Sequence, residues 1–316
     1  MHLVTYSVKG NRRLGALVGD HVVDLRAAYA AARGADPRFA AALFPRDMVA
    51  FLSGGELALE AAREALEYGR RSDVDGETVA GCPVRLPRSE VRLEAPVPRP
   101  GKVVCIGLNY RDHARETGAR IPEQPIFFSK FPSNVIGPED DVVHPGDAIT
   151  SQVDYEVELV VVMGRGGRHI PEERALDYVA GYTVGNDVSA RDLQLQRGSQ
   201  WAKGKALDTF APMGPALVTA DEVPNPNGLR IQMRLNGQTM QDSNTSEMIF
   251  SVPVLIAFLS RLFAFQPGDV IYTGTPSGVG LARDPQVWVR PGDVMEAEVE
   301  RLGVLRNRVV AAESGS

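Results

Sequence analysis

The sequence predicts an α+β protein that is mostly β, in which a small α+β domain precedes a larger, strand-rich one. Short apolar runs with many β-branched residues recur from about residue 101 onward, and such runs are typical of strands. Pro-Gly-Asp before an apolar residue, a signal for a tight turn feeding a strand, occurs at 145–147, 267–269 and 291–293. The five prolines between 83 and 100 interrupt any helix or central strand.

The proline-rich stretch divides the chain into parts of different composition. We expect a small α+β domain over 1–80, a linker over 81–100, a catalytic domain over 101–312 and a disordered tail over 313–316. The long second domain is expected to hold the functional residues, because the motifs described below all lie within it.

Apolar runs and helix-forming residues predict the individual elements. Three strands are expected in the first domain, at 3–6, 14–18 and 21–25, with a hairpin turn between the last two. Five helices are expected along the chain, at 26–34, 56–70, 110–118, 171–178 and 246–263. In the last helix, residues 252, 255, 256 and 259 are apolar at helical spacing, which predicts a core-facing side rather than a ligand site.

Composition excludes several classes of protein. With 44% hydrophobic and 23% charged residues, the chain has a soluble globular profile, and no apolar run is long enough to predict a membrane span. Cys82 and Cys105 are too few for a disulfide framework, and residues 1–6 lack a signal-peptide pattern, so we expect a cytoplasmic protein. A net charge of -6 without a concentrated basic face argues against nucleic-acid binding.

The strongest functional signal is Asp154-Tyr-Glu-Val-Glu158, followed directly by an apolar strand-like run. Side chains alternate along a strand, so Glu156 and Glu158 are expected on one face, with Asp154 behind them. Two adjacent carboxylates entering a core need a neutralising charge, and a divalent cation supplies it. The alternative is a solvent-facing acidic strand at a sheet edge.

A second carboxylate strengthens the metal hypothesis. Asp187 follows another β-branched stretch, at the end of a predicted strand, where it is well placed as a third ligand. Three carboxylates suit Mg²⁺ or Mn²⁺. Zinc is not expected, because the five His and two Cys form no closely spaced ligand pair.

Three further segments carry side chains suited to catalysis. His113 and Glu116 lie three apart on a predicted helix, where the carboxylate would orient the ring and favour a general base; the alternative is a surface pair. Lys203 and Lys205 lie near Trp201, and a lysine there would stabilise developing negative charge, unless both are solvated loop residues.

The third segment is the glycine-rich loop 272–280, which contains Thr275. It lacks the Gly-Lys-Ser/Thr ending of a phosphate loop, so a nucleotide site is not expected. Its free amides and Thr275 suit a substrate carboxylate, and the alternative is a plain structural turn.

Taken together, these segments resemble the fumarylacetoacetate hydrolase family. The similar stretches occur in family order over residues 101–310: Ile106-Gly-Leu-Asn-Tyr-Arg-Asp-His113, Asp154-Tyr-Glu-Val-Glu-Leu159, Asn186-Asp-Val-Ser-Ala-Arg-Asp192, Trp201-Ala-Lys-Gly-Lys205, Asp208-Thr-Phe-Ala-Pro212, Met248-Ile-Phe-Ser251 and Tyr272-Thr-Gly-Thr-Pro-Ser-Gly-Val-Gly280. Seven motifs in order are far more specific than any one of them.

The resemblance implies a mixed β-sandwich roll, a homodimer, and Mg²⁺ or Mn²⁺ bound by Glu156, Glu158 and Asp187. It implies that His113, assisted by Glu116, activates water. The remaining residues are implied to act on the substrate, with Lys205 as the active-site lysine and four side chains near the acid groups: Arg191, Gln194, Thr275 and Lys130.

Asn109-Tyr-Arg-Asp-His113 resembles the short bacterial members, which include acylpyruvate hydrolases, 2-hydroxyhepta-2,4-diene-1,7-dioate isomerases and hydrolases of diketo-deoxy sugar acids. The expected function is therefore metal-dependent hydrolysis of a C–C bond in a small 2-oxo or 2,4-diketo acid during catabolism, for example of aromatic compounds. A decarboxylase or isomerase, of the heptadienedioate or oxaloacetate type, stays an alternative, because a decarboxylase needs the same enolate stabilisation and an isomerase needs only proton shuttling. A lower alternative is a non-catalytic module braced by its metal.

Overall fold

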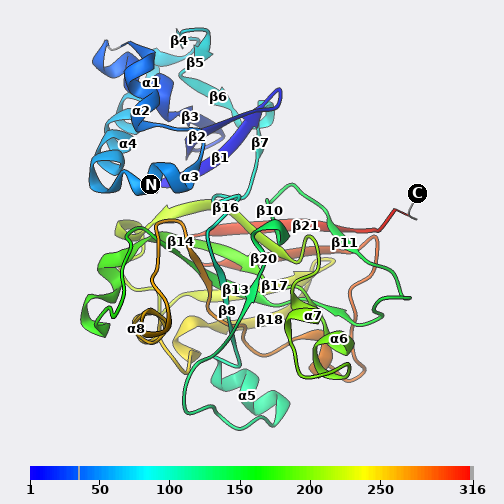
Figure 1. Ribbon diagram of the computed structural model, residues 1–316. Helices are drawn as coiled ribbons and strands as arrows, with labels where there is room; N and C mark the ends of the chain where they lie inside the picture. Colours follow the sequence, from blue (N-terminus) through cyan, green and yellow to red (C-terminus); the bar gives the residue numbers. More distant parts are fainter. Residues whose placement is uncertain (35, 314–316) are drawn as a thin grey trace.

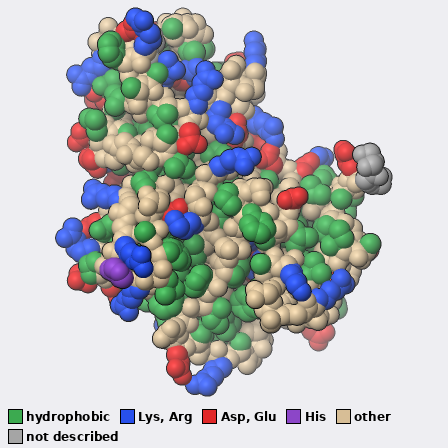
Figure 2. Space-filling model, viewed as in Figure 1, with side chains coloured by type: hydrophobic (Ala, Val, Ile, Leu, Met, Phe, Trp, Pro, Cys, Tyr) green, Lys and Arg blue, Asp and Glu red, His purple; other side chains and the backbone are tan. Residues whose placement is uncertain are grey.

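The computed structural model describes residues 1–34 and 36–313, so the expected tail lies, apart from Glu313, outside the described residues. Strand accounts for 34% and helix for 28%, which confirms the α+β, mostly β class. Figure 1 shows an N-terminal lobe, drawn in blue and cyan, beside a larger β-rich body. On the face seen in Figure 2, basic and acidic side chains occur over both parts.

A twelve-stranded sheet runs through both parts of the molecule. Its main path is β6 (Arg85–Pro87), β3 (His21–Asp24), β2 (Asn11–Val18), β1 (His2–Val8), β16 (Ala211–Thr219), β14 (Val179–Asn186), β13 (Val157–Met163), β19 (Val270–Tyr272), β8 (Val103–Gly107) and β9 (Ile126–Lys130). Two short strands pair beside this path, β7 (Arg92–Leu93) with β1 and β10 (Val135–Ile136) with β16. Because β1 pairs with β16, the first domain expected from the sequence shares a sheet with the second. The division into 1–80, 81–100 and 101–312 stays a prediction about folding units.

The β-rich body also contains a second sheet. It has five strands, in the order β11 (Val142–His144), β21 (Gly303–Ala311), β20 (Val294–Val299), β17 (Arg230–Leu235) and β18 (Gln238–Asn244). Two further pairs are β12 (Val153–Asp154) with β15 (Ser189–Ala190), and β4 (Thr78–Val79) with β5 (Cys82–Pro83). The β12–β15 pair brings the two acidic segments of the sequence together.

The described helices cover the outside of the sheets. The α-helices are α1 (Leu25–Arg33), α2 (Pro37–Leu43), α3 (Met48–Ser53), α4 (Gly55–Gly69), α5 (Arg111–Thr117), α6 (Arg191–Leu195), α7 (Ala202–Lys205) and α8 (Val252–Leu262). The 3₁₀ segments are η1 (Ser72–Val74), η2 (Arg88–Glu90), η3 (Pro132–Asn134), η4 (Glu172–Tyr178), η5 (Ala220–Glu222), η6 (Thr245–Glu247) and η7 (Gly280–Ala282).

Most predicted elements are present, with two corrections. The three N-terminal strands and the helices α1, α4 and α5 lie within three residues of their expected bounds. The segment expected as a helix at 171–178 is instead the 3₁₀ segment η4. The helix expected over 246–263 begins only at Val252, because Pro253 lacks an N–H and fits only in a first turn.

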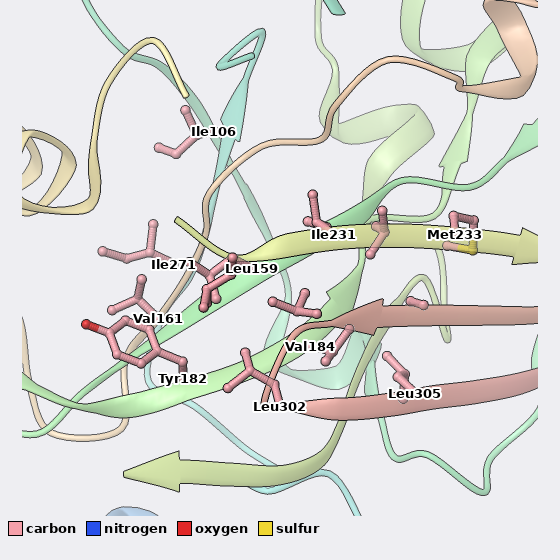
Figure 3. Packing of buried hydrophobic residues seen from close by; sticks show 14 of the residues in the cluster. Ile106, Leu159, Val161, Tyr182, Val184, Ile231, Met233, Ile271, Leu302 and Leu305 are labelled. Carbon is pink, nitrogen blue, oxygen red and sulfur yellow. The ribbon is translucent and has the colours of Figure 1, made fainter. Parts of the chain in front are cut away.

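The core of the β-rich body lies between the two sheets. Strand β13 is buried throughout, and its side chains alternate between this core and the one facing the N-terminal lobe. Leu159 and Val161 point into the inter-sheet core with Ile231 and Met233 of β17 (Figure 3). Since β13 is held on both faces, the acidic residues at its beginning have a rigid base.

Two of the three Pro-Gly-Asp segments feed strands as predicted. Those at 267–269 and 291–293 lead directly into β19 and β20. Gly268 and Gly292 adopt φ of 81° and 98°, a conformation that favours glycine. The segment at 145–147 also turns, but it leads into a turn and not into a strand.

Candidate metal centre and active site

Three buried carboxylates meet where β13 and β14 come together. Glu156 lies between β12 and β13, Glu158 is in β13, and Asp187 directly follows β14. The Asp187 N–H donates to the Glu156 carbonyl oxygen at 2.8 Å, which fixes the two segments side by side. One oxygen from each carboxylate lies within 4.8 Å of the others, and the residues are at most 5% exposed.

Cationic side chains surround this carboxylate trio. The Lys205 ammonium donates to Glu156 Oε2 at 2.8 Å and to Asp187 Oδ2 at 2.9 Å. Arg191 lies 2.6 Å from Glu156 Oε1 and donates to Asp154 Oδ2 at 2.8 Å. Both cations come from the short helices α6 and α7, which pack against β15. Arg191 and Lys205 together bind both carboxylate oxygens of Glu156.

Lys130 supports the trio from behind without satisfying it. Its Nζ lies 2.7 Å from Asp187 Oδ1, but it donates its hydrogens to the carbonyl oxygens of Val188, Phe210 and Lys205. An ammonium group has three hydrogens, so none is left for the carboxylate. Among the described residues, Asp187 Oδ1 therefore has no hydrogen-bond partner, and neither does Glu158 Oε1.

The charges of this cluster do not balance. Four buried carboxylates, those of the trio and Asp154, face three cations, Lys130, Arg191 and Lys205. Burial, then Asp187 and Glu156, raise the pKa of Glu158 well above its usual range. Burial also opposes ionisation of Glu156, but Lys205 and Arg191 outweigh it and lower its pKa to about 2. Glu158 is thus the carboxylate whose ionisation the cations of the cluster do not compensate.

A hard divalent cation fits this donor set. The two unpartnered oxygens belong to carboxylates, the ligands that Mg²⁺ and Mn²⁺ prefer, and both are buried. A dication would turn the cluster's single excess negative charge into a net positive charge. The cluster would then attract an anionic substrate.

The glycine-rich loop binds the protein's own carboxylates. The Gly274 N–H donates to Glu158 Oε2 at 2.7 Å, and the Gly278 N–H donates to both Glu116 oxygens at 2.9 and 3.0 Å. The Gly280 and Leu281 amides donate to Asp154 at 2.7 and 3.0 Å. The sequence suggested that these amides bind a substrate carboxylate, but the structure uses them to orient the acidic residues.

Helix α5 carries His113, the predicted general base, which lines the same pocket as Glu156 of the trio. His113 Nδ1 lies 3.4 Å from Glu116 Oε2, one turn along the helix. Burial raises the pKa of Glu116, but the contact with His113 and the Gly278 N–H outweigh it, so the pKa is lowered overall. Glu116 therefore stays anionic and holds the His113 ring, leaving Nε2 for the pocket.

A pocket of about 250 Å³ opens beside the trio. Its polar lining includes six predicted site residues, His113, Glu156, Arg191, Gln194, Lys205 and Thr275, together with Thr117, which was not predicted. Its apolar lining includes Ile106, Leu108, Phe128, Leu195, Trp201 and Leu281. Glu116, Lys130, Glu158 and Asp187 lie next to these residues but do not line it.

Thr275 and Arg191 differ in what they can offer a ligand. The Thr275 hydroxyl donates to the Val157 carbonyl oxygen at 2.9 Å and accepts from Gln241 at 2.8 Å, so its hydrogen is already used. Arg191 Nη2 is buried and has no partner among the described residues. The arginine is thus the better donor for a substrate carboxylate.

Two further polar residues of the site were not among the predicted set. Asp154 accepts from Arg191 and from two loop amides, and its place beside the Glu-Val-Glu segment was its sequence signal. Gln241 is fully buried and links Val157 N, Thr275 and the Pro276 carbonyl oxygen. Nothing in the sequence around Gln241 distinguishes it from other residues of an amphipathic strand.

Comparison with known proteins identifies the family. The model of the fumarylacetoacetate (FAA) hydrolase C-terminal family matches residues 102–310, about two thirds of the chain. The chain belongs to this family. As a member of the fumarylacetoacetate hydrolase family, it shares a fold with enzymes of several activities.

Named relatives illustrate that range. The chain is 50% identical to human oxaloacetate tautomerase FAHD2A, mitochondrial, over 84% of this chain and 80% of the relative. A 2-hydroxyhepta-2,4-diene-1,7-dioate isomerase from Mycobacterium marinum is 37% identical with a TM-score of 0.63, covering 73% of this chain and 82% of that one. Maleylpyruvate hydrolase from Sphingobium sp. SYK-6, in complex with manganese(II) and pyruvate, is 30% identical with a TM-score of 0.74, covering 99% and 100%.

The similar proteins do not share one reaction. The relatives include a tautomerase, an isomerase and a hydrolase, so the expected enzyme class holds only at the level of the family. Over the described residues, the structure has no helix with the length and apolarity needed to cross a membrane. The cytoplasmic location stays a prediction.

Proposed function

We propose that this protein is a divalent-metal-dependent tautomerase that interconverts the enol and keto forms of oxaloacetate. One observation carries the proposal: a carboxylate trio with two unpartnered buried oxygens, next to a small pocket that holds two cations and an imidazole. The 50% identity to a relative named as an oxaloacetate tautomerase supports this choice over a C–C bond hydrolase.

The donor set indicates what the cation contributes. Glu156, Glu158 and Asp187 would hold Mg²⁺ or Mn²⁺, which would supply Lewis-acid chemistry for an acidic substrate. Arg191 and Lys205 add fixed positive charge on the same side of the pocket. Lys205 stays protonated, because Asp187 and Glu156 outweigh its burial and raise its pKa. It therefore acts by stabilising negative charge and not as a base.

The proton transfer then falls to His113. Its Nδ1 faces Glu116, so Nε2 can accept the proton of the enol hydroxyl. The O–H electron pair forms the C=O bond, and the C=C pair takes at C3 the proton that the imidazolium returns, so one proton leaves oxygen, one reaches carbon and the imidazole is restored. Glu116 orients the ring in both states.

The proposal is tested by following the ultraviolet absorbance of enol-oxaloacetate with the Mn²⁺-loaded protein. We expect a decay well above the uncatalysed rate. His113→Ala should lower kcat by about 10²–10⁴-fold, the usual contribution of a general base. Arg115→Ala, which removes an exposed side chain of α5 that does not line the pocket, is the matched control. A wild-type rate equal to that of Mn²⁺ in buffer would reject the proposal.

The second candidate is hydrolysis of a C–C bond in an acylpyruvate. The His113–Glu116 pair beside the pocket is also suited to activating water, and the maleylpyruvate hydrolase is similar over the whole chain. Acetylpyruvate distinguishes the two, since only hydrolysis releases acetate and pyruvate from it. Oxaloacetate decarboxylation, the third reaction of this group, is read from CO₂ release.

Two expectations from the sequence accompany this proposal. We propose a homodimer, which sedimentation equilibrium tests directly. We also propose that the cation takes part in chemistry and does not merely brace the fold, because a ligand of the trio, Glu156, lines an open pocket. A metal fully enclosed by protein oxygens in a Mn²⁺-bound crystal structure would contradict the second proposal.

A further inference from the structure

Trp201 is part of the apolar lining of the pocket. The residue caps the one-turn helix α7, whose last residue is Lys205, and the Lys205 N–H donates to the Trp201 carbonyl oxygen at 3.1 Å. Residues four apart on a helix share a face, so both side chains point into the pocket. Gly204 between them has no room for a side chain, because a Cβ would overlap the Ala190 carbonyl oxygen. The helix is therefore fixed against its neighbours.

The Trp201 indole is packed firmly in place. It lies against Gly107 at the end of β8, where a Cβ would overlap the ring. Its other neighbour is Phe128 of β9, at an edge-to-face centroid distance of 5.8 Å. Indole and phenyl rings in this arrangement form a rigid apolar wall.

A chain of contacts connects the trio to these rings. Lys205 Nζ contacts Glu156 and Asp187, and it lies 5.2 Å from the Phe128 ring centroid. Trp201 contacts the same Phe128 ring, at a centroid distance of 5.8 Å. Lys205, Phe128 and Trp201 all line the pocket, so a ligand bound by Lys205 has both rings in the wall around it.

We propose that Trp201 sets the upper length of the acid that the pocket accepts, and restricts it to four-carbon 2-oxo dicarboxylic acids. This inference rests on the proposed function and names its specificity residue. The pocket's 250 Å³ corresponds to about eight waters of liquid volume, below the usual range of small-molecule sites. On this proposal, a longer acid bound at the trio runs against the indole, which packs on Gly107 and Phe128.

The test measures binding instead of turnover. Isothermal titration calorimetry of the Mn²⁺-loaded protein compares oxalate, which reaches only the trio, with the five-, six- and seven-carbon 2-oxo dicarboxylic acids. In the wild type, we expect the affinity to fall with each added methylene. In Trp201→Ala the fall should largely disappear, so that the seven-carbon acid gains at least about tenfold relative to oxalate, within the range of about 10–200-fold per methylene.

Controls separate this inference from the proposed function and from a folding defect. Trp288→Phe changes the other tryptophan, which lies outside the pocket lining, and should keep the wild-type length profile. Trp201→Phe is a milder truncation and should give an intermediate dependence of affinity on acid length. It replaces Trp201→Ala as the test if the alanine variant fails to fold. An unchanged profile in a folded Trp201 variant overturns the inference, whatever the tautomerase assay shows. Absence of tautomerase activity with a changed profile rejects only the proposed function.

Discussion

Two buried clusters of charged side chains differ in how completely their atoms are partnered. In the N-terminal lobe, Asp24 is 1% exposed, and both of its oxygens are satisfied. Tyr6 donates to Oδ2 at 2.5 Å, Arg13 donates to both oxygens, and the Ala27 N–H donates to Oδ1 at 2.7 Å, which caps helix α1. One carboxylate, one cation and two neutral donors close this cluster.

The cluster around β13 and β14 is incompletely partnered, and we call it the open cluster, in contrast to the closed cluster around Asp24. It has one more carboxylate than cations, and the unpartnered oxygens of Glu158 and Asp187 lie in it. Buried polar atoms without partners are costly and therefore rare in folded proteins. The two clusters therefore differ in how completely their charges are partnered and not in whether the charges are buried.

The largest expected effect comes from removing a ligand of the open cluster. Glu158→Gln keeps the acceptor for the Gly274 N–H but removes the charge, so kcat/KM for enol-oxaloacetate should fall by about 10²–10³-fold or more. Because the buried charge is gone, the metal-free variant should unfold at no lower urea concentration than the wild type. Full activity at saturating Mn²⁺ would remove Glu158 from the metal site.

The opposite result is expected in the closed cluster. Asp24→Ala leaves Arg13 and Tyr6 without their acceptor and removes the cap of α1, so the free energy of unfolding should fall by about 3 kcal/mol. Urea denaturation measures this loss, while kcat of the folded protein should not change. Asp73→Ala, which breaks an exposed pair with Arg71, is the control and should leave the free energy of unfolding close to that of the wild type.

Metal addition distinguishes the clusters by a third route. Mn²⁺ at one hundred times its dissociation constant should stabilise the wild type by about 2.7 kcal/mol, because it binds the folded state only. Calorimetric melting with EDTA and with Mn²⁺ reads this difference. Asp24→Ala should keep the increment and Glu158→Gln should lose it. Equal increments in both variants would place the metal elsewhere.

The comparison also explains what the sequence could and could not predict. Alternation along a strand places Glu156 and Glu158 on one side, and a strand end before Asp187 suggests a third ligand; both signals are local. The fold class followed from the density of short apolar runs. These features depend on neighbours in the chain, so a single sequence contains them.

The remaining features depend on contacts between distant segments. No local pattern shows that Lys130 uses its hydrogens on three carbonyl oxygens, or that the Gly278 amide binds Glu116 from 162 positions away. The pairing of β1 with β16 joins residues more than two hundred positions apart. The same limit hid Gln241 and the packing of Trp201 on Gly107.

The smallest expected effect is for Asp112, a carboxylate that belongs to neither cluster. Its Oδ2 accepts from Ser243 at 2.6 Å and from Ser277 at 3.3 Å, and it is only partly buried. These contacts fix α5 to β18 and to the glycine-rich loop, so Asp112 is a positioning residue for His113. Asp112→Ala should lower kcat by about tenfold, the value of one or two charged hydrogen bonds. Mn²⁺ affinity should not change, because the trio is untouched.

The conservative variant separates positioning from general destabilisation. Asp112→Asn keeps one acceptor oxygen for the serine hydroxyls and should recover most of kcat, whereas a purely structural defect would lower the melting temperature of both variants equally. Ser243→Ala removes the shorter of the two contacts and should reproduce part of the loss. If Asp112→Ala instead weakens Mn²⁺ binding as Glu158→Gln does, then α5 is coupled to the open cluster itself, and the orientation of His113 depends on the metal.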